Sequence, residues 1–338
     1  MSDEDAYARA GVSQRQADEA VEALVAQLGR IDPGRPSRVV GLPGHYASVI
    51  RIDEHTGVAF GTDGVGTKMV LAERLGRFDT IGIDCVAMNV NDLVCVGAEP
   101  IALLDFILCA DADPDVCGQI GVGLRRGAEL AGVEIPGGEI AQVGDVVSGW
   151  ELTASAIGLV GLEEIVTGAR GEPGDALIGL PSSGLHSNGY TLARAALDEV
   201  PLDDWRLGRP LGDVLLEPTE IYVRAVLELL RGDVDVRGLA HITGDGLNNL
   251  LRLGGGVGYE IDSPLPVPPV FELIRELGGV GEQQMYEVFN MGLGFVCVVA
   301  AADTGAALET LGRHHPGAAR IGNVTDAAGR IERPGAGG

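Results

Sequence analysis

The chain has 338 residues, with 49 Asp and Glu against 24 Lys and Arg, and its formal net charge at pH 7 is −25. A surface this acidic repels nucleic acids and anionic lipids, so the composition excludes both as partners. No apolar run reaches the roughly 18–20 residues that a membrane span needs, and the acidic N-terminus is unlike a secretory signal. We therefore expect a cytoplasmic protein, and its length favours two domains.

The cysteines and lysines narrow the possibilities further. There are five cysteines, an odd number without CxxC spacing, so neither a disulfide framework nor a structural zinc site is expected. Lys68 is the only lysine of the chain. A lysine-poor, strongly acidic composition leads us to the hypothesis that the protein is adapted to high salt.

The first half of the chain alternates helix and strand patterns. Apolar spacing and breaker residues predict, in chain order, a helix (17–28), two strands (47–52 and 57–62), a short helix (69–75), a longer helix (79–97), a buried strand (101–110), a helix (about 115–131) and a strand (152–161). The longer helix is almost wholly apolar, and Asp79 is its predicted N-cap.

The stretch 161–175 is charged and rich in glycine, which predicts an interdomain linker. Beyond it we expect, in chain order, a strand (175–180), helices (190–197 and 217–230), the start of a helix (247–253) and strands (257–262, 293–300 and 318–324). The fold class is α/β, or α+β, in two domains, 1–165 and 170–332.

A glycine-rich loop joins the second strand to the short helix, in the sequence GTDGVGTKMV. Glycines allow a close approach of the backbone to a ligand, and a helix N-terminus offers free N–H groups to an anion. The loop therefore predicts a phosphate site, with a hairpin turn as the alternative. Its candidate residues are Asp63, Gly64, Val65, Gly66, Thr67 and Lys68.

Three polar residues interrupt the apolar helix 79–97, namely Asp84, Asn91 and Asp92. Buried carboxylates are costly unless they are paired or bind a cation. Together with Asp63, the two aspartates could bind Mg²⁺, which prefers oxygen ligands. The alternative is that these acids cap loops or pair with arginines.

Four further stretches combine glycines with polar side chains: GGEIAQ (137–142), PSSGLHSNGY (181–190), AHITGDGLNN (240–249) and FNMGLG (289–294). The first offers Glu139 as another cation ligand, with a structural turn as the alternative. The second is suited to wrap a phosphate or a sugar. From these residues alone, the chain is predicted to be an enzyme that acts on a phosphorylated substrate with ATP and Mg²⁺.

Taken together and in order, GTDGVGTKMVLA, DTIGIDCVAMNVNDLVCVGAEP, GGEIAQ, LPSSGLHSNGY, EPTEIYV, AHITGDGL and MYEVFNMGLG closely resemble the phosphoribosylformylglycinamidine cyclo-ligase (AIR synthetase) family. The opening AYARAGV (6–12) also looks like the N-terminal segment of that family. The resemblance implies an N-terminal domain that pairs across a homodimer. It also implies ATP-dependent closure of formylglycinamidine ribonucleotide to aminoimidazole ribonucleotide, with ADP and phosphate released.

By this resemblance, each candidate residue receives a role. The predicted catalytic residues are Lys68, His186 and His241, with His186 as the first choice of general base. The nucleotide would contact the loop 63–68, Asn91, Gly137, Gly138 and Glu139, and the metal would bind Asp63, Asp84 and Asp92. The ribonucleotide would face Ser183, Gly184, His186, Ser187, Asn188, Thr243 and Asn290. Expected cofactors are ATP and Mg²⁺, with K⁺ as a further candidate.

The sequence departs from the family pattern at GGEIAQVGD and HITGDG, where Gln142 and Asp245 stand at unexpected positions. The alternatives are another ATP-dependent kinase or synthetase of the same superfamily, and a non-catalytic nucleotide-binding scaffold.

Overall fold

The computed structural model describes residues 14–333. The segment 6–12, which looks like the start of the family, lies outside the described residues. The helices are α2 (Gln14–Leu28), α3 (Lys68–Leu75), α4 (Ile81–Cys95), α5 (Pro114–Ala131), α6 (Tyr190–Ala196), α7 (Leu211–Leu215), α8 (Val223–Arg231), α9 (Pro269–Gly278), α10 (Glu282–Val288) and α11 (Thr304–His314). Within residues 14–333, no helix is long and apolar enough to cross a membrane.

The strands form two six-stranded sheets. The first has the order β1-β2-β3-β6-β4-β5, with β1 (Val39–Val40), β2 (Ser48–Arg51), β3 (Thr56–Gly64), β4 (Glu99–Cys109), β5 (Glu134–Gln142) and β6 (Trp150–Gly161). The second has the order β12-β9-β11-β7-β10-β8, with β7 (Ala176–Pro181), β8 (Val236–His241), β9 (Gly258–Ile261), β10 (Leu293–Val299), β11 (Ala319–Thr325) and β12 (Ile331–Glu332). The predicted α/β class is confirmed.

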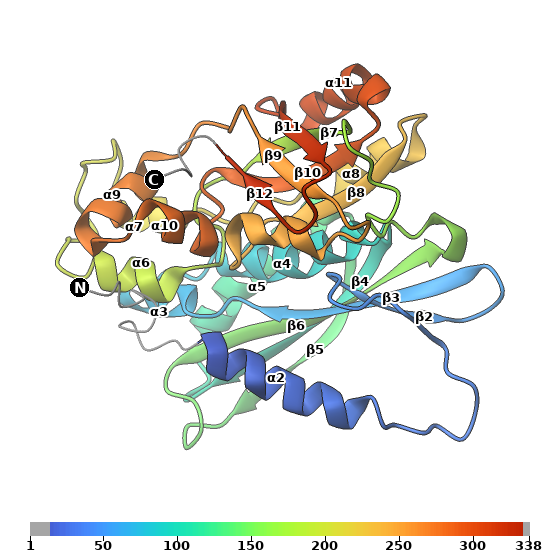
Figure 1. Cartoon of the computed structure of the whole chain (residues 1–338). Helices are drawn as coiled ribbons and strands as arrows, with labels where there is room; N and C mark the ends of the chain where they lie inside the picture. The colour runs from blue at the N-terminus through green and yellow to red at the C-terminus, as the bar shows by residue number, and fades with distance from the viewer. Residues whose placement is uncertain (1–13, 334–338) are drawn as a thin grey trace.

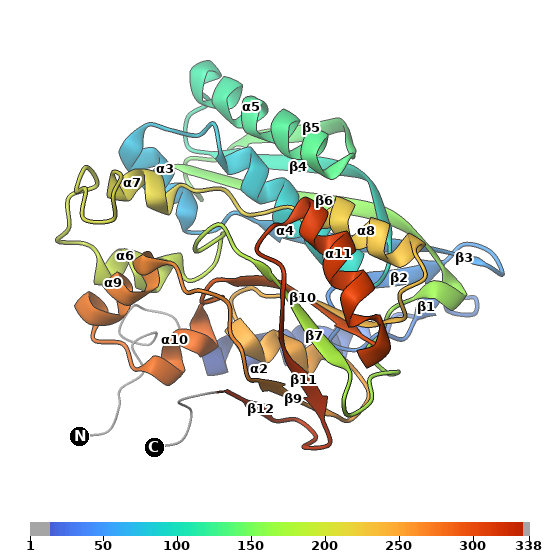
Figure 2. The ribbon, with the colours of Figure 1, turned by 90° about the horizontal axis from the view of Figure 1, so that it is seen from above.

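Helix α4 lies at the centre of the molecule, between the two sheets (Figure 1). It packs on α5 and on β3, β6 and β4 of the first half, and it also contacts β8 and α8 of the second. In the view from above, α5 lies on the far side of α4 from the second sheet (Figure 2). Polar side chains on the side of α4 that contacts β8 and α8 therefore lie at the junction of the two halves.

The ends of α4 are set by backbone geometry. Gly97 adopts a φ of +79° after the last turn, where a left-handed residue ends a helix, as the sequence predicts. The prediction of Asp79 as N-cap is wrong. The helix begins after Thr80, whose side chain makes no capping hydrogen bond.

The predicted helix over 217–230 is wrong at its start, because α8 begins only at Val223 and residues 217–222 are irregular. Side chains of α4, Asp84 and Asn91, accept hydrogen bonds from backbone N–H groups of this segment. These contacts replace the hydrogen bonds that a helix would have made. Proline at position 218 is compatible with a helix start, so the local sequence carried no warning.

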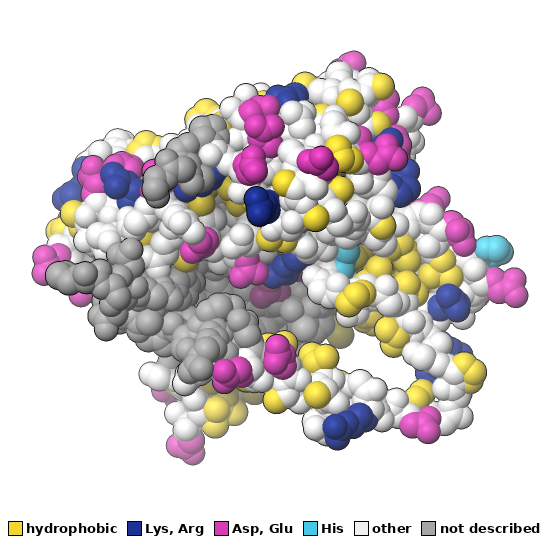
Figure 3. Space-filling view, in the orientation of Figure 1, with side chains coloured by type: hydrophobic (Ala, Val, Ile, Leu, Met, Phe, Trp, Pro, Cys, Tyr) yellow, Lys and Arg dark blue, Asp and Glu magenta, His cyan; other side chains and the backbone are white. Residues whose placement is uncertain are grey.

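One face of the first sheet carries apolar side chains that nothing within residues 14–333 covers. They include Phe60, Leu104, Phe106 and Leu159, which the strand register places on the same face and which are 39–53% exposed. The expectation that strand 101–110 is buried on both faces is therefore wrong for the single chain. The arm that carries α2 stands away from the body, with open space between them (Figure 3). Four apolar side chains of α2, at positions 21, 24, 25 and 28, are also more than half exposed.

Candidate active site

The glycine-rich loop follows β3, which pairs with β6 so that Asp63 lies opposite Ala154. Three of the loop amides already have acceptors within the chain: Gly64 N–H donates to Asp63 Oδ1 at 2.7 Å, Val65 N–H to Leu152 O at 2.9 Å, and Gly66 N–H to Glu151 Oε1 at 3.4 Å. The open part of the loop is Gly66 and Thr67, which are exposed. Gly66 has a φ of +64° and no atom within 4 Å of where a Cβ would stand, so space for a ligand exists there.

Lys68 lies in a different environment from the one that the sequence predicts. Its side chain is fully buried, with Nζ 2.9 and 2.8 Å from the two carboxylate oxygens of Asp84. Nζ also donates to the backbone oxygens of Glu217 at 2.7 Å and His186 at 3.1 Å, and it lies 5.6 Å from the ring centre of Tyr190. Burial lowers the pKa of Lys68, while the charge of Asp84 acts to raise it. With its donors committed, Lys68 is not available to a phosphate in this structure.

The predicted three-carboxylate metal site is not assembled. Within the described residues, no group of three or more His, Cys, Asp or Glu side chains is placed to hold a metal ion. Asp84 is fully buried and accepts from Lys68 and from both N–H and Oγ1 of Thr219, each at 2.7 Å. Asp84 thus forms an ion pair in this structure, the alternative class that the sequence left open, with lysine in place of arginine, and its role as a metal ligand stays a prediction.

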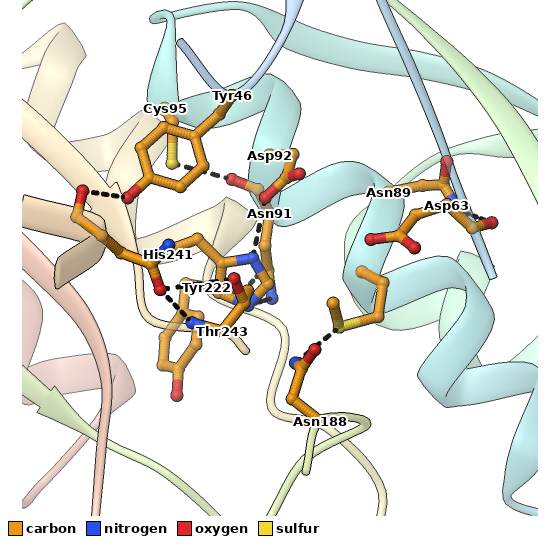
Figure 4. Close-up of polar contacts among 12 residues, drawn as sticks. Tyr46, Asp63, Asn89, Asn91, Asp92, Cys95, Asn188, Tyr222, His241 and Thr243 are labelled. Atoms are coloured by element: carbon orange, nitrogen blue, oxygen red, sulfur yellow. Dashed lines mark hydrogen bonds and ion pairs between the residues drawn. The ribbon is translucent and has the colours of Figure 1, made fainter. Parts of the chain in front are cut away.

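Asp63 and Asp92 differ from Asp84 because both are partly exposed. Burial raises the pKa of Asp63, a hydrogen bond from Gly64 N–H lowers it, and the charge of Asp92 raises it again. Asp92 thus lies close enough for its charge to act on Asp63. They come from β3 and α4, and they share the view in Figure 4 with Asn188 and Thr243 from the second half.

His241 ends β8 and is fully buried. Its Nδ1 lies 2.9 Å from Asp92 Oδ1, and its Nε2 lies 3.4 Å from Asn91 Nδ2 (Figure 4). Because Asn91 Nδ2 also donates to Glu220 O, we assign Nε2 as the acceptor and Nδ1 as the protonated nitrogen. Both ring nitrogens then have partners within the chain, and His241 orients the Asp92 carboxylate; its role as a catalytic group stays a prediction. Asn91, which is predicted to contact the nucleotide, joins α4 to the second half of the chain through hydrogen bonds with the backbone of Glu220 and Tyr222.

His186, the predicted general base, is also fully buried. Its Nε2 accepts from Ser183 N–H at 3.3 Å, and Nδ1 has no hydrogen-bond partner. Burial lowers the pKa of His186 well below its usual value. Its φ of +62° is left-handed, which is unusual for a side chain of this size. The ring is enclosed in this structure, with its centre 6.3 Å from that of the Tyr222 ring, and its role as the general base stays a prediction.

The other loop residues are closer to the surface. Ser187 Oγ lies 3.3 Å from Thr219 Oγ1, and Asn188 Nδ2 lies 3.8 Å from Met88 Sδ. Both serine and asparagine are partly exposed, as is Ser183. They remain candidates for contacting substrate, and nothing in the geometry conflicts with that role.

Asn290 and Thr243 have structural partners. Asn290 is buried, and its Nδ2 donates to Gly184 O while its Oδ1 accepts from Ser182 Oγ. Asn290 and Gly184 thus hold the loop 181–189 in place, and their role as ribonucleotide contacts stays a prediction. Thr243 N–H donates to Asn249 Oδ1 at 2.7 Å, but Thr243 stays partly exposed.

The predicted nucleotide residues of β5 lie far from the loop within this chain. Gly137, Gly138 and Glu139 are exposed at the sheet edge, and β6 and β4 separate them from β3. Three strand spacings correspond to about 14 Å. A Cβ at Gly138 would lie 2.3 Å from Asp105 Oδ1, so this glycine makes room for a carboxylate. The chain alone therefore does not bring these residues to the phosphate loop.

Sequence reasoning missed Glu151, at the start of β6. Its Oε1 accepts from Gly66 N–H at 3.4 Å, and it would stand 3.1 Å from a Cβ at Gly64. Burial raises the pKa of Glu151. The sequence showed only an acidic residue at the start of a strand whose apolar and polar residues alternate. This pattern is too common to identify a site.

The two departures from the family pattern have simple partners. Asp245 Oδ2 pairs with Arg252 Nη2 at 2.7 Å, and that guanidinium lies 5.2 Å from the ring centre of Tyr46. Tyr46 in turn donates to Asn249 O at 2.8 Å. Gln142 Nε2 donates to Asp111 at the surface. Asp245 thus stabilises its own loop against the first half of the chain.

Comparisons with known proteins agree with this architecture. Residues 44–160 match the family model for the N-terminal domain of AIR synthase related proteins, and residues 172–332 match the C-terminal one. Among solved structures, the chain is similar to a HypE–HypF complex (TM-score 0.63, 21% identity, 86% of this chain and 90% of that one). It is also similar to AaThiL complexed with AMPPCP and TMP (TM-score 0.61, 17% identity, 88% and 89%). These structures share the fold.

Curated relatives are more similar in sequence. The phosphoribosylformylglycinamidine cyclo-ligase of Methanothermobacter thermautotrophicus is 46% identical over 333 residues, covering 96% of this chain and 96% of that protein. The cyclo-ligase of Pyrococcus furiosus is 44% identical over 329 residues, with the same coverage. The chain belongs to the AIR synthase family, and within it to the phosphoribosylformylglycinamidine cyclo-ligases.

Proposed function

We propose that this chain closes formylglycinamidine ribonucleotide to aminoimidazole ribonucleotide, at the cost of one ATP. The observation that carries the proposal is the identity of about 45% with cyclo-ligases over nearly the full length of both proteins. A sister kinase of the fold is less favoured, because the similarity to those structures stays near 20% identity. A non-catalytic scaffold has no observation in its favour.

The chemistry proceeds in two steps. The γ-phosphoryl group moves from ATP to the formyl amide oxygen, and ADP leaves. The amidine nitrogen then attacks the activated carbon, phosphate departs with the former formyl oxygen, and the nitrogen loses a proton. Amide oxygen leaves poorly until it is phosphorylated, so positioning and charge neutralisation are the main tasks of the enzyme.

We assign the nucleotide to the exposed part of the loop, Gly66 and Thr67, because Gly66 has no Cβ and no atom lies within 4 Å of where one would stand. Asp63 and Asp92 are the proposed ligands of Mg²⁺, since they are two partly exposed carboxylates that β3 and α4 bring to the junction, and this ion prefers oxygen ligands. Bound there, Mg²⁺ would neutralise phosphate charge. A requirement for K⁺ is part of the same proposal and has no ligand set in its support.

Ser187, Asn188 and Thr243 are the proposed contacts of the ribonucleotide, because each stays partly exposed beside the junction. No base is assigned. Asp63 and Glu151 are the acids near the loop whose pKa burial raises, which suits a group that exchanges protons.

We further propose a homodimer in which the uncovered apolar face of the first sheet meets a second copy. Exposed Phe60, Leu104 and Phe106 are costly in water, and a cyclic dimer buries the same patch twice. In this assembly, the nucleotide-binding domain is 1–165 and the second domain is 170–332. The proposed location of the protein is the cytoplasm, where ATP is available.

The test is an assay with purified protein, ATP, Mg²⁺ and formylglycinamidine ribonucleotide. ADP and aminoimidazole ribonucleotide are expected in equal amounts, and only when the ribonucleotide is present. ADP without ring closure would identify a kinase instead. Folded protein that binds ATP but releases no ADP would support the scaffold.

A further inference from the structure

The ammonium of Lys68 joins four segments that are far apart in the sequence. It begins α3, pairs with Asp84 on α4, and donates to the backbone of His186 and of Glu217. The separations along the chain are 16, 118 and 149 residues. Each acceptor is 2.7–3.1 Å from Nζ, and none of the lysine side chain is exposed.

The geometry matches lysine in particular. An ammonium has three donor protons, and three groups accept from it here: one carboxylate and two carbonyl oxygens. An arginine would present a planar fork of five donors, which cannot point to three converging acceptors in a closed site. The position of the only lysine in an arginine-rich chain is thus explained by the shape of its acceptors.

The two backbone partners of Lys68 lie in irregular segments that need external support. Residues 217–222 make contacts with Asp84 and Asn91 instead of forming a helical turn. Loop 183–188 contains His186 in its left-handed conformation, and the carbonyl of that residue accepts from Lys68. Strained or irregular backbone persists only where the surroundings fix it.

We propose that Lys68 is a positioning residue, which locks loop 183–188 and segment 217–222 onto α4 and thereby places the ribonucleotide-facing side chains. It does so without contact to the phosphates of ATP. The inference rests on the proposed function for the identity of the substrate. The lock itself is a property of the free protein and can be tested without turnover.

The experiment compares Lys68→Met with the double variant Lys68→Met/Asp84→Asn. In the single variant, the Asp84 carboxylate stays buried without its cation, which is the costly case. In the double variant neither charge remains, and the asparagine oxygen can still accept from Thr219. The control is Arg77→Met, which breaks an ion pair with Asp213 that also joins the two halves of the chain but is exposed.

The first measurement is hydrogen–deuterium exchange of the free protein. Lys68→Met is expected to speed exchange at residues 183–189 and 217–222 by about tenfold or more, because local opening no longer breaks the lock. The double variant should recover part of this protection, and Arg77→Met should leave it unchanged. Unchanged exchange in Lys68→Met would overturn the proposal.

The second measurement separates the two substrates. Equilibrium binding of ATP with Mg²⁺ to Lys68→Met should stay within about twofold of wild type, whereas kcat/KM for the ribonucleotide should fall about a hundredfold, as for a misplaced group. The double variant should regain part of it. A large loss of ATP affinity that Asp84→Asn does not restore would show a phosphate contact instead and overturn the proposal.

Two outcomes are kept separate by design. If Lys68→Met does not fold, the same comparison is made between wild type and the double variant, with the same expected direction. If wild-type protein binds ATP but closes no ring, the proposed function fails. The exchange measurement then still decides whether Lys68 is the lock.

Discussion

Two glycines of α5 should respond in opposite ways to the same substitution. Gly121 is exposed, and a Cβ there would have no atom within 4 Å. Gly123 is buried against the start of α4, where a Cβ would lie 2.7 Å from Gly82 N and 2.8 Å from Asp79 O. Both variants gain the helix propensity of alanine, which is about 1 kcal/mol. They differ only in the space that the new methyl group finds.

The cost at Gly123 follows from these distances. To reach an ordinary contact of 3.4 Å, the helices must separate by about 0.7 Å (3.4 minus 2.7) because backbone atoms cannot turn away. Overpacking of this kind costs about 1–3 kcal/mol or more. We therefore expect Gly123→Ala to lower the free energy of unfolding by about 1–2 kcal/mol and Gly121→Ala to raise it by up to about 1 kcal/mol.

The assay is urea unfolding followed by circular dichroism, at one fixed salt concentration for both variants. Turnover is measured in parallel, since a displaced α4 would also move Asp84, Asn91 and Asp92. Equal stabilities for the two variants would refute the reasoning that α4 is positioned by close backbone contact with α5. A stable Gly123→Ala with wild-type turnover would do the same.

Four further predictions concern pH, metal, assembly and salt. Burial lowers the pKa of His315 from 6.5 to about 4, so below pH 6.5 the unfolded chain binds a proton more readily than the folded chain. The free energy of unfolding should therefore fall by up to about 3 kcal/mol as the pH drops from about 6.5 to 4. His315→Gln should flatten this part of the curve of unfolding free energy against pH. Asp92→Asn should raise the Mg²⁺ concentration for half-maximal turnover by about tenfold or more, whereas Asp111→Asn at the surface should not change it. Leu104→Glu should convert the proposed dimer to a monomer, as measured by light scattering. Val122→Glu should not, because Val122 is also an exposed apolar residue but lies on α5, away from that face. Unfolding temperature should rise from low to molar KCl as screening weakens the repulsion of the net charge of −25, and indifference to salt would contradict the hypothesis of salt adaptation.

The local pattern of the sequence was enough to predict most elements. Apolar periodicity and breakers predicted α2, α4 and α5 because these signals act within one helix. It also singled out Asp84, Asn91 and Asp92 as costly residues on an apolar helix. What it could not supply was their partners. Asp84 meets Thr219 at a separation of 135 residues, and Asp92 meets His241 at 149.

The same limit explains why the sequence could not foresee the burial of three candidate residues. Lys68, His186 and His241 are of residue types that catalyse reactions, and their burial depends on how the two halves of the chain meet. Strand 101–110 reads as buried on both faces, but within the chain only one face is covered. An apolar run of this kind is typical of a strand that is covered on both faces, which agrees with the proposal that a second copy covers the exposed face of the first sheet.

The measurement that tests the account most directly follows the formyl oxygen. Substrate carrying ¹⁸O at the formyl group is incubated with the enzyme, ATP and Mg²⁺, and the phosphate released is examined by mass spectrometry. The account predicts one ¹⁸O in each phosphate, formed in step with ADP and aminoimidazole ribonucleotide. Unlabelled phosphate, with the ¹⁸O lost to water, would contradict activation of the amide by phosphorylation.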